Sequence, residues 1–275
     1  MSDVKLGDHV VGPGRPLFVL AGPCVLEDPD EMLRTAGTIA EIARRVGVGV
    51  CFKASYTKDN RTSSASYRGP GMEEGLKLLA RIADAHGLPV VTDVHHPEEA
   101  VAAAEVVDVL QIPAFLCRQS SLLEAAAGTG RVVNVKKGQF LAPPDMEHVI
   151  GKLRAAGCGQ VMATERGSFF GYRDLVVDYR AHHVMHGFDV PVVFDATHST
   201  QSPGSGGGVT GGTPELIPLL MRCGLAAGAD ALFIETHPEP ARAKSDAGCQ
   251  LPLANFEALL VEAKKWRDLY LESTS

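Results

Sequence analysis

The segment from Lys53 to Gly71 has the composition of an anion-binding loop. It reads KASYTKDNRTSSASYRGPG and follows an apolar run, Val46 to Phe52, that is typical of a buried strand. Lysine provides a point charge for phosphate or carboxylate, Arg61 provides a planar guanidinium, and Asn60, Thr62 and the serines add hydrogen-bonding groups. A polar connection of this length between a strand and a helix is more often functional than idle. The composition alone fits both an anion-binding loop and a solvated basic loop.

Polar or metal-binding residues follow the other apolar runs as well. In chain order, the eight runs are followed by Cys24, by Lys53, by Asp93 and His95, by Gln111 with Pro113 and Ala114, by Lys136 and Lys137, by Glu165 and Arg166, by Asp195 and His198, and by Glu235 and His237. The helix-to-strand connections are plain by comparison. This asymmetry is typical of a barrel enzyme, whose site lies at the C-terminal ends of the strands. Such a site would contain at least four cations: Lys53, Lys58, Lys136 and Arg166, with Arg61 as a fifth.

Four of the polar residues are candidate ligands for one divalent metal ion. Cys24 is a soft ligand, His198 is intermediate, and the carboxylates of Glu235 and Asp246 are hard, a set that suits Zn²⁺, Fe²⁺ or Mn²⁺. Their spacing in the sequence is long, so only a barrel that joins the ends of strands one, seven and eight at one rim would assemble them. The alternative for Cys24 is a small residue buried in the core.

The composition excludes several other classes of protein. The 275 residues are 45% hydrophobic, which allows a large core, and 26 Lys and Arg stand against 33 Asp and Glu. The formal charge of −7 argues against nucleic acid as a partner. We see no signal peptide, and the apolar runs are too short to span a membrane. The six dispersed cysteines, without a CxxC pair, favour a reduced cytoplasmic protein.

Strands and helices are expected to alternate along the whole chain. Near-continuous apolar strands suit a parallel sheet that is covered on both faces. The expected strands are Leu17–Ala21, Val48–Ala54, Pro89–Thr92, Val107–Ile112, Arg131–Val135, Gln160–Thr164, Val190–Phe194 and Ala231–Ile234. The expected helices are 28–45, Met72–His86, Pro97–Ala104, Ser120–Ala127, Pro144–Ala156, Tyr179–His186, Thr213–Ala227 and 253–271.

Eight such units predict an α/β fold of the (β/α)₈ TIM-barrel type, with residues 1–275 forming a single catalytic domain. Val4 to Val10, before the turn at Gly12 to Gly14, predicts a short N-terminal β-ribbon. A Rossmann-like sheet is the alternative, but AGPCVLED after the first strand lacks the GxGxxG fingerprint. We expect the glycine-rich segment Pro203–Gly212 to be a mobile loop over the rim.

The motifs as a set resemble the 3-deoxy-D-manno-octulosonate 8-phosphate synthase family, also called the 2-dehydro-3-deoxyphosphooctonate aldolases. The matching pieces are AGPCVLED, FKASYTKDNRTSSASYRGPG, TDVHHP, LQIPAFLCRQ, NVKKGQFLAP, TERGSFFGY, FDATHSTQSPG and FIETHPEPARAKSD. They extend from the first strand to the last loop. The family motif KANRSS stands here as KDNRTS, in which Asp59 and Thr62 differ, and Thr62 keeps the hydroxyl. A cysteine at position 24 resembles the metal-dependent class.

The resemblance implies roles for individual residues. The metal ligands would be Cys24, His198, Glu235 and Asp246. Phosphoenolpyruvate would be bound by Lys53, Lys58, Lys136 and Arg166, with Gln111 and the backbone of Ala114 nearby. The pentose phosphate would lie toward Asn60, Arg61 and Thr62. Four residues would act at the reacting groups: Lys58, Asp93, His198 and Cys24.

The reaction implied is the condensation of phosphoenolpyruvate with D-arabinose 5-phosphate and water, which gives 3-deoxy-D-manno-octulosonate 8-phosphate and phosphate on the way to the lipopolysaccharide sugar Kdo. Lys58 or a metal-bound water would supply the proton. The alternatives are the related 3-deoxy-arabino-heptulosonate 7-phosphate synthase, which uses erythrose 4-phosphate, a class II aldolase, and a sugar-phosphate-binding protein without activity. By analogy with the family we expect a homotetramer.

Overall fold

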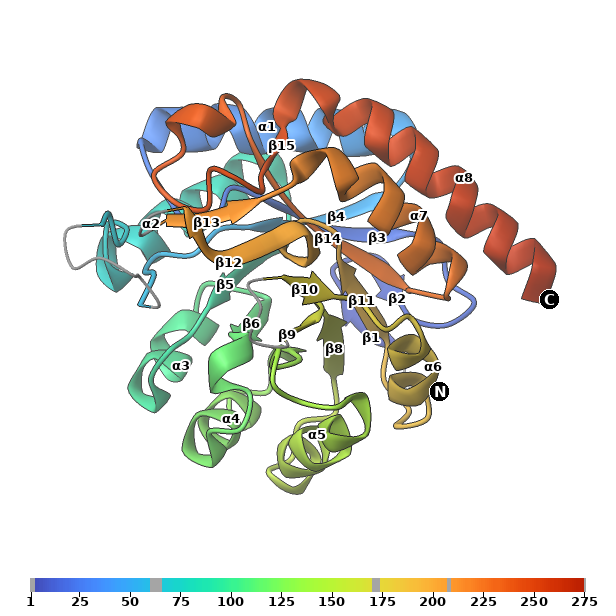
Figure 1. Cartoon of the computed structure of the whole chain (residues 1–275). Helices are drawn as coiled ribbons and strands as arrows, with labels where there is room; N and C mark the ends of the chain where they lie inside the picture. The colour runs from blue at the N-terminus through green and yellow to red at the C-terminus, as the bar shows by residue number, and fades with distance from the viewer. Residues whose placement is uncertain (1–2, 60–65, 170–173, 207–208, 275) are drawn as a thin grey trace.

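Eight parallel strands close into a barrel in the computed structural model, which describes residues 3–59, 66–169, 174–206 and 209–274 (Figure 1). The strands pair in chain order, and β11 pairs with β14 to close the ring. The predicted (β/α)₈ barrel is confirmed. The barrel strands are β3 (Phe18–Gly22), β4 (Gly49–Lys53), β5 (Val90–Asp93), β6 (Val109–Ile112), β7 (Val132–Lys136), β8 (Val161–Glu165), β11 (Val192–Asp195) and β14 (Ala231–His237).

Eight α-helices surround the barrel in the described ranges (Figure 1). They are α1 (Pro29–Val46), α2 (Met72–His86), α3 (Pro97–Ala104), α4 (Ser120–Ala127), α5 (Met146–Ala155), α6 (Arg180–His186), α7 (Ile217–Ala226) and α8 (Phe256–Thr274). Helix α1 shows why they form where predicted: Asp28 caps it by accepting from the backbone N–H groups of Asp30 and Glu31, and Gly47 ends it with φ 76°. None of the described helices has the length and apolar character that a membrane span requires.

The two-residue period of the strands separates two apolar layers. Val90 and Leu110 face the helices in the larger cluster, whereas their neighbours Val91 and Val109 face the barrel interior. The next inward positions toward the C-terminal ends are polar, and they include Asp93 on β5 and Gln111 on β6. The interior is therefore apolar near its middle and polar at one mouth, which is where the sequence placed its candidate site residues.

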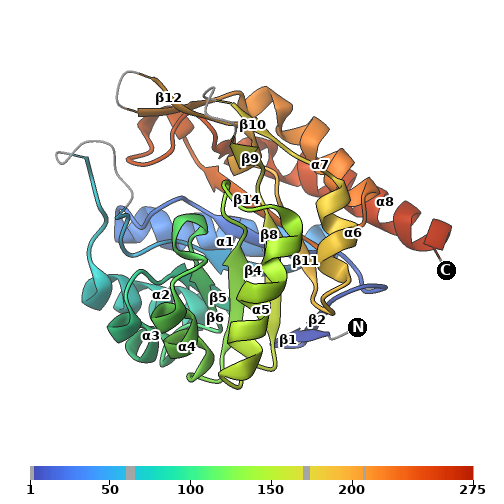
Figure 2. The ribbon, with the colours of Figure 1, turned by 60° about the horizontal axis from the view of Figure 1, so that its bottom comes forward.

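The N-terminal ribbon closes the other end of the barrel. Strands β1 (Val4–Leu6) and β2 (His9–Val11) pair antiparallel, as predicted. Val4, Leu6 and Val11 are buried in the same apolar cluster as the barrel interior. Figure 2 shows this ribbon at the end opposite to β9, β10 and β12. Solvent thus has access to the polar groups from the C-terminal mouth.

Short strands that periodicity did not predict lie at the C-terminal mouth. They are β9 (Ser168–Phe169), β10 (Leu175–Val176), β12 (Gln201–Gly206), β13 (Val209–Gly212) and β15 (Leu251–Pro252). The expectation of a loop at Pro203–Gly212 was wrong, because β12 and β13 form an antiparallel ribbon. Its base is closed by the N–H of Thr213, which donates to Thr200 O at 3.0 Å. Single helical turns complete the described chain: η1 (Ala114–Leu116), η2 (Pro143–Asp145), η3 (His198–Thr200), η4 (Pro214–Leu216), η5 (Pro240–Arg242) and η6 (Leu253–Asn255).

A buried arginine joins the last helix to the N-terminal end of the barrel. The guanidinium of Arg267 on α8 is fully buried and pairs with Asp230 at 3.1 Å. It also donates to the carbonyl oxygens of Gly12, Arg15 and Ala229 at 3.0–3.1 Å. The side chain therefore fixes the segment after the ribbon against α8.

Replacing Arg267 with methionine is expected to lower the free energy of unfolding by about 3–5 kcal/mol, because a buried carboxylate and three carbonyl groups lose the guanidinium as a hydrogen-bond donor. Urea denaturation at one fixed protein concentration measures this change. Arg45, whose exposed side chain pairs with Glu257 at 2.7 Å, is the matched control, and its methionine variant should lose no more than about 1 kcal/mol. Equal losses in the two variants would contradict a structural role specific to Arg267.

Candidate active site

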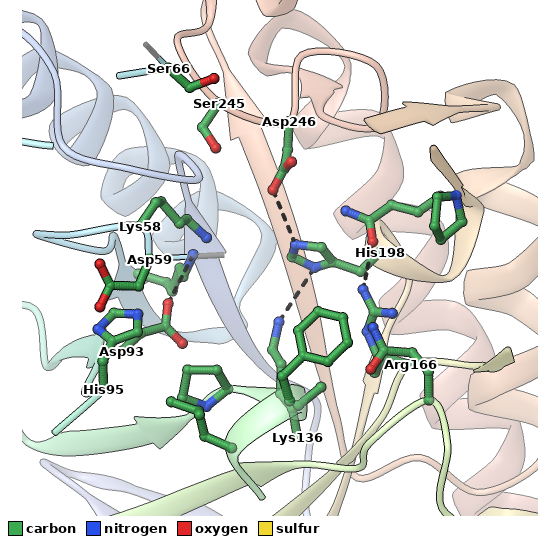
Figure 3. A pocket seen from close by; sticks show the side chains of 18 of the residues that line it. Lys58, Asp59, Ser66, Asp93, His95, Lys136, Arg166, His198, Ser245 and Asp246 are labelled. Carbon is green, nitrogen blue, oxygen red and sulfur yellow. Dashed lines mark hydrogen bonds and ion pairs between the residues drawn. The ribbon is translucent and has the colours of Figure 1, made fainter. Parts of the chain in front are cut away.

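The C-terminal mouth of the barrel contains a cavity of about 640 Å³. Figure 3 shows Lys58 and Asp93 on one side, Arg166 and His198 on the other, and Lys136 between them. The predicted site residues that line the cavity are Lys53, Lys58, Asp93, Ala114, Lys136, Arg166, His198 and Asp246. Cys24, Gln111 and Glu235 lie buried behind its wall. Asn60, Arg61 and Thr62 lie outside the described residues.

The four candidate metal ligands converge at one edge of this cavity. The ligand atoms of Cys24, Glu235 and Asp246 all lie within 4.8 Å of one another, with Cys24 Sγ 3.1 Å from Asp246 Oδ2. His198 Nε2 lies 3.5 Å from Glu235 Oε2 and 3.9 Å from Asp246 Oδ2. The barrel therefore brings together the ends of β3, β11 and β14 and the loop that follows β14, as the sequence required.

These residues fit a divalent cation. Glu235 is fully buried, and its Oε2 atom has no hydrogen-bond partner among the residues that the structure describes. Burial raises the pKa of the Cys24 thiol well above its ordinary value, and the nearby Asp246 and Glu235 raise it further. A bound cation would offset the repulsion among these groups and favour the thiolate, because metal binding displaces the proton of a thiol.

Asp195 orients both a metal-ligand candidate and a cation. Its Oδ2 accepts from Lys136 Nζ and from His198 Nδ1, each at 2.7 Å. Its Oδ1 accepts from the backbone N–H of His198 at 2.8 Å and from the hydroxyl of Thr197 at 3.1 Å. Because Nδ1 of His198 carries the proton in this arrangement, its Nε2 lone pair faces Glu235 and Asp246. The sequence placed Asp195 at a strand end but gave it no role.

Two lysines occupy the side of the cavity near β4. Lys53 is 1% exposed and donates to Glu235 Oε1 at 2.8 Å and to the carbonyl of Cys24 at 3.0 Å. Lys58 Nζ lies 4.0 Å from the same Glu235 oxygen. Burial alone would raise the pKa of Asp93, but the ammonium groups of Lys53 and Lys58 hold it well below its usual range. Asp93 is therefore an ionised acceptor in this site.

The opposite side presents a guanidinium with spare hydrogen-bonding capacity. Arg166 donates to Gln201 Oε1 at 2.6 Å, while its Nη1 is buried and lacks a partner in the described part of the chain. Lys136 Nζ lies 3.5 Å from the centre of the Phe233 ring, and burial lowers the pKa of Lys136 against the opposing effect of Asp195. An arginine with a free N–H edge suits a planar carboxylate or a phosphate. The sequence did not indicate that Gln201 would accept a hydrogen bond from Arg166 and so orient its guanidinium.

A second cluster of carboxylates and histidine is better explained as structural support for the loop after β14 than as a metal site. Glu27, Glu31 and His237 place ligand atoms within 4.8 Å of one another. The backbone N–H of Glu239, however, donates to His237 Nδ1 at 3.0 Å, so the proton of the neutral ring is on Nε2, which points toward Glu27. A histidine that binds metal through Nε2 carries its proton on Nδ1 instead. Glu27 also accepts from the N–H of Lys244 at 2.9 Å, which ties down the loop of Asp246.

Known proteins are similar to this chain over most of its length. Residues 2–272 match the model of the DAHP synthetase I family. The chain belongs to this family. It is 56% identical over 245 residues to the 2-dehydro-3-deoxyphosphooctonate aldolase of Nitratidesulfovibrio vulgaris, which covers 89% of this chain and 90% of that protein. The resemblance inferred from the motifs is thereby confirmed.

Two further relatives extend the similarity over nearly the whole chain. The 2-dehydro-3-deoxyphosphooctonate aldolase of a Synechococcus species is 51% identical over 269 residues, covering 98% of this chain and 95% of the relative. The protein of the same name from a Geobacter species is 50% identical over 262 residues, covering 95% of this chain and 96% of the relative.

Proposed function

We propose that this protein condenses phosphoenolpyruvate with D-arabinose 5-phosphate and water to form 3-deoxy-D-manno-octulosonate 8-phosphate and inorganic phosphate. The observation that carries this proposal is the meeting of four cations, Lys53, Lys58, Lys136 and Arg166, with a cluster of candidate metal ligands around one cavity. The names of the aldolase relatives at 50% identity or more support the same reaction. The enzyme is a 3-deoxy-8-phosphooctulonate synthase.

The cations match the charges of the substrates. Phosphoenolpyruvate has a phosphate and a carboxylate, and the pentose adds a second phosphate, so fixed positive groups must offset their repulsion before the carbon atoms can meet. Arg166 lies on one side of the cavity and Lys58 on the other, with Lys136 between them (Figure 3), and Lys53 also lines the cavity. We assign phosphoenolpyruvate to these four residues, with Gln111 and Ala114 beside it. The sugar phosphate is assigned to Asn60, Arg61 and Thr62 in the neighbouring loop.

In the proposed reaction, C3 of phosphoenolpyruvate attacks the aldehyde carbon of the open-chain sugar. Water adds at C2, and phosphate then leaves with cleavage of its C–O bond. Lys58, as an ammonium beside Glu235 and Asp93, is placed to give a proton to the developing alkoxide. Asp93 accepts hydrogen bonds from the sugar, and the buried charges of Lys136 and Arg166 hold the phosphate and carboxylate while C2 gains positive character.

Cys24, His198, Glu235 and Asp246 are the residues that would hold one divalent ion, with Zn²⁺, Fe²⁺ and Mn²⁺ as candidates. When bound, the ion would supply Lewis acidity to the reaction. His198 and Cys24 thus act by holding the ion, while Asp195 keeps the imidazole in the tautomer that binding needs.

Release of inorganic phosphate from phosphoenolpyruvate tests the proposed function. We expect release with arabinose 5-phosphate, loss after chelation, and recovery after return of a divalent metal. Faster turnover with erythrose 4-phosphate would instead assign the heptulosonate reaction. Tight binding of both ligands without release of phosphate would leave a sugar-phosphate-binding protein, and cleavage of a sugar bisphosphate without phosphoenolpyruvate would indicate a class II aldolase.

We further propose that one domain of residues 1–275 assembles as a homotetramer in the cytoplasm. Large apolar side chains at the C-terminal mouth support an assembly, since Phe115, Phe140 and Phe169 are 42–56% exposed. Six unpaired thiols suit a reducing compartment. Light scattering coupled to size-exclusion chromatography would test the assembly, and a mass of one chain, 29.1 kDa, would exclude the tetramer.

A further inference from the structure

A chain of hydrogen bonds crosses four neighbouring strands beneath the cavity. Thr164 Oγ1 on β8 donates to Asn134 Oδ1 at 2.7 Å, and Asn134 Nδ2 on β7 donates to Gln111 Oε1 at 3.0 Å. Gln111 Nε2 on β6 donates to Asp93 Oδ1 at 2.7 Å. Ser55 donates to the other oxygen of this carboxylate. The exposed fractions of Thr164, Asn134, Gln111 and Asp93 are 5% or less.

We call this chain of hydrogen bonds from Thr164 to Asp93 the relay. The donors and acceptors that each side chain offers determine the orientation of every amide in it. The carboxylate of Asp93 only accepts hydrogen bonds, so Gln111 must present its amide nitrogen to Asp93 and its carbonyl oxygen to Asn134. That oxygen requires a donor, which forces the amide nitrogen of Asn134 toward it. The oxygen of Asn134 then needs a donor, and the hydroxyl of Thr164 supplies it. Removal of the terminal hydroxyl would leave a buried oxygen unpaired, and a flipped Asn134 would set two oxygens against each other.

We infer that Asn134 and Thr164 are positioning residues for the site: they fix the orientations of Gln111 and Asp93, which in turn border the bound substrates. This inference rests on the proposed function, in which Gln111 lies beside phosphoenolpyruvate and Asp93 contacts the sugar. Register supports it, because Asp93 pairs directly with Gln111 and Gln111 with Asn134 across adjacent strands. Of these four side chains only Asp93 lines the cavity, so Asn134 and Thr164 can influence the site only through Gln111 and Asp93.

Substitution of Thr164 by valine tests the relay, because valine keeps the shape and removes the hydroxyl. We expect kcat/KM to fall about tenfold, as one unsatisfied buried acceptor costs on the order of one power of ten. Thr164→Ser should restore activity to within about threefold of the parent, since it returns the donor. In an Asn134→Leu background the valine substitution should cause no further loss, because Thr164 acts through Asn134.

Thr92→Val is the matched control. Thr92 is also a buried threonine on a barrel strand, next to Asp93, but its hydroxyl has no hydrogen-bond partner in the described ranges. Metal content and circular dichroism should match the parent in all variants. If Thr164→Val does not fold, Thr164→Ala takes its place. Failure of both to fold would assign the relay to stability alone and overturn the inference.

Two further results would overturn it. One is a folded Thr164→Val protein with the kcat/KM of the parent, and the other is an equal loss from this substitution with and without Asn134→Leu. Calorimetric affinity for phosphoenolpyruvate separates this inference from the proposed function. If the parent protein releases no phosphate, the proposed function fails, and the relay is judged by whether valine weakens phosphoenolpyruvate binding and serine restores it.

Discussion

Replacement of Cys24 by alanine is expected to lower phosphate release by about 100-fold or more and to reduce the metal content of the purified protein, because it removes the only soft ligand of the candidate set. Chelation of the parent should cause a similar loss. Elemental analysis and a phosphate-release assay, both before and after metal return, measure these effects. The alanine variant should recover little activity when metal is added back.

Cys223 offers a matched control, since it is a free, partly buried thiol on α7 that is not among the candidate ligands. Its alanine variant should keep the metal content and rate of the parent. A Cys24→Ala protein with full activity in the presence of chelator would exclude the proposed role of the ion. Cys24→Asn gives a finer test, because the asparagine amide is polar but is a much weaker metal ligand than a thiolate. Metal-free activity in that variant would mean that the ion mainly organises the site.

Replacement of Asp195 by asparagine is expected to reduce activity by about 100-fold and to weaken metal binding by about 10–100-fold. Each carboxylate oxygen of Asp195 accepts from two donors, which are Lys136 and His198 at one oxygen and Thr197 and the His198 backbone at the other. Asparagine has an NH₂ group in place of one oxygen, so either orientation sets donors against donors. The imidazole of His198 and the ammonium of Lys136 would both lose their fixed positions.

Activity, metal content and metal affinity of the Asp195→Asn protein check this expectation. Asp178→Asn is a suitable control, because Asp178 pairs with the exposed Arg180 at 2.8 Å outside the cavity. Its variant should behave as the parent does. An Asp195→Asn protein that retains tight metal binding and full turnover would show that the two hydrogen bonds at Oδ2 do not orient the site.

Much of the fold followed from the sequence because barrel strands are short apolar runs with clear ends. All eight strands occur within a few residues of their predicted ranges, as β4 (Gly49–Lys53) illustrates for the predicted Val48–Ala54. The two-residue strands β9 and β10 and the ribbon of β12 and β13 were missed. Strands of two residues are too short to show a period, and in Pro203–Gly212 the glycines hid the strand pattern.

Residue types in the sequence determined which chemistry was available: lysine and arginine for anions, and one thiol, one imidazole and two carboxylates for a metal ion. The position after a strand also predicted the mouth at which they would meet, because parallel barrel strands end at the same rim. Asn60, Arg61 and Thr62 lie outside the described residues, so their placement remains a prediction.

Tertiary structure alone decided which of these groups touch. Asp195 joins Lys136 to His198, Gln201 holds Arg166, and the relay from Thr164 ends at Asp93. None of these contacts has a sequence signature, because each depends on the register between strands and on rotamers that burial selects. The sequence pattern of a strand gives only the periodicity of that strand. A hydrogen bond across the barrel depends on the relative positions of two or more strands.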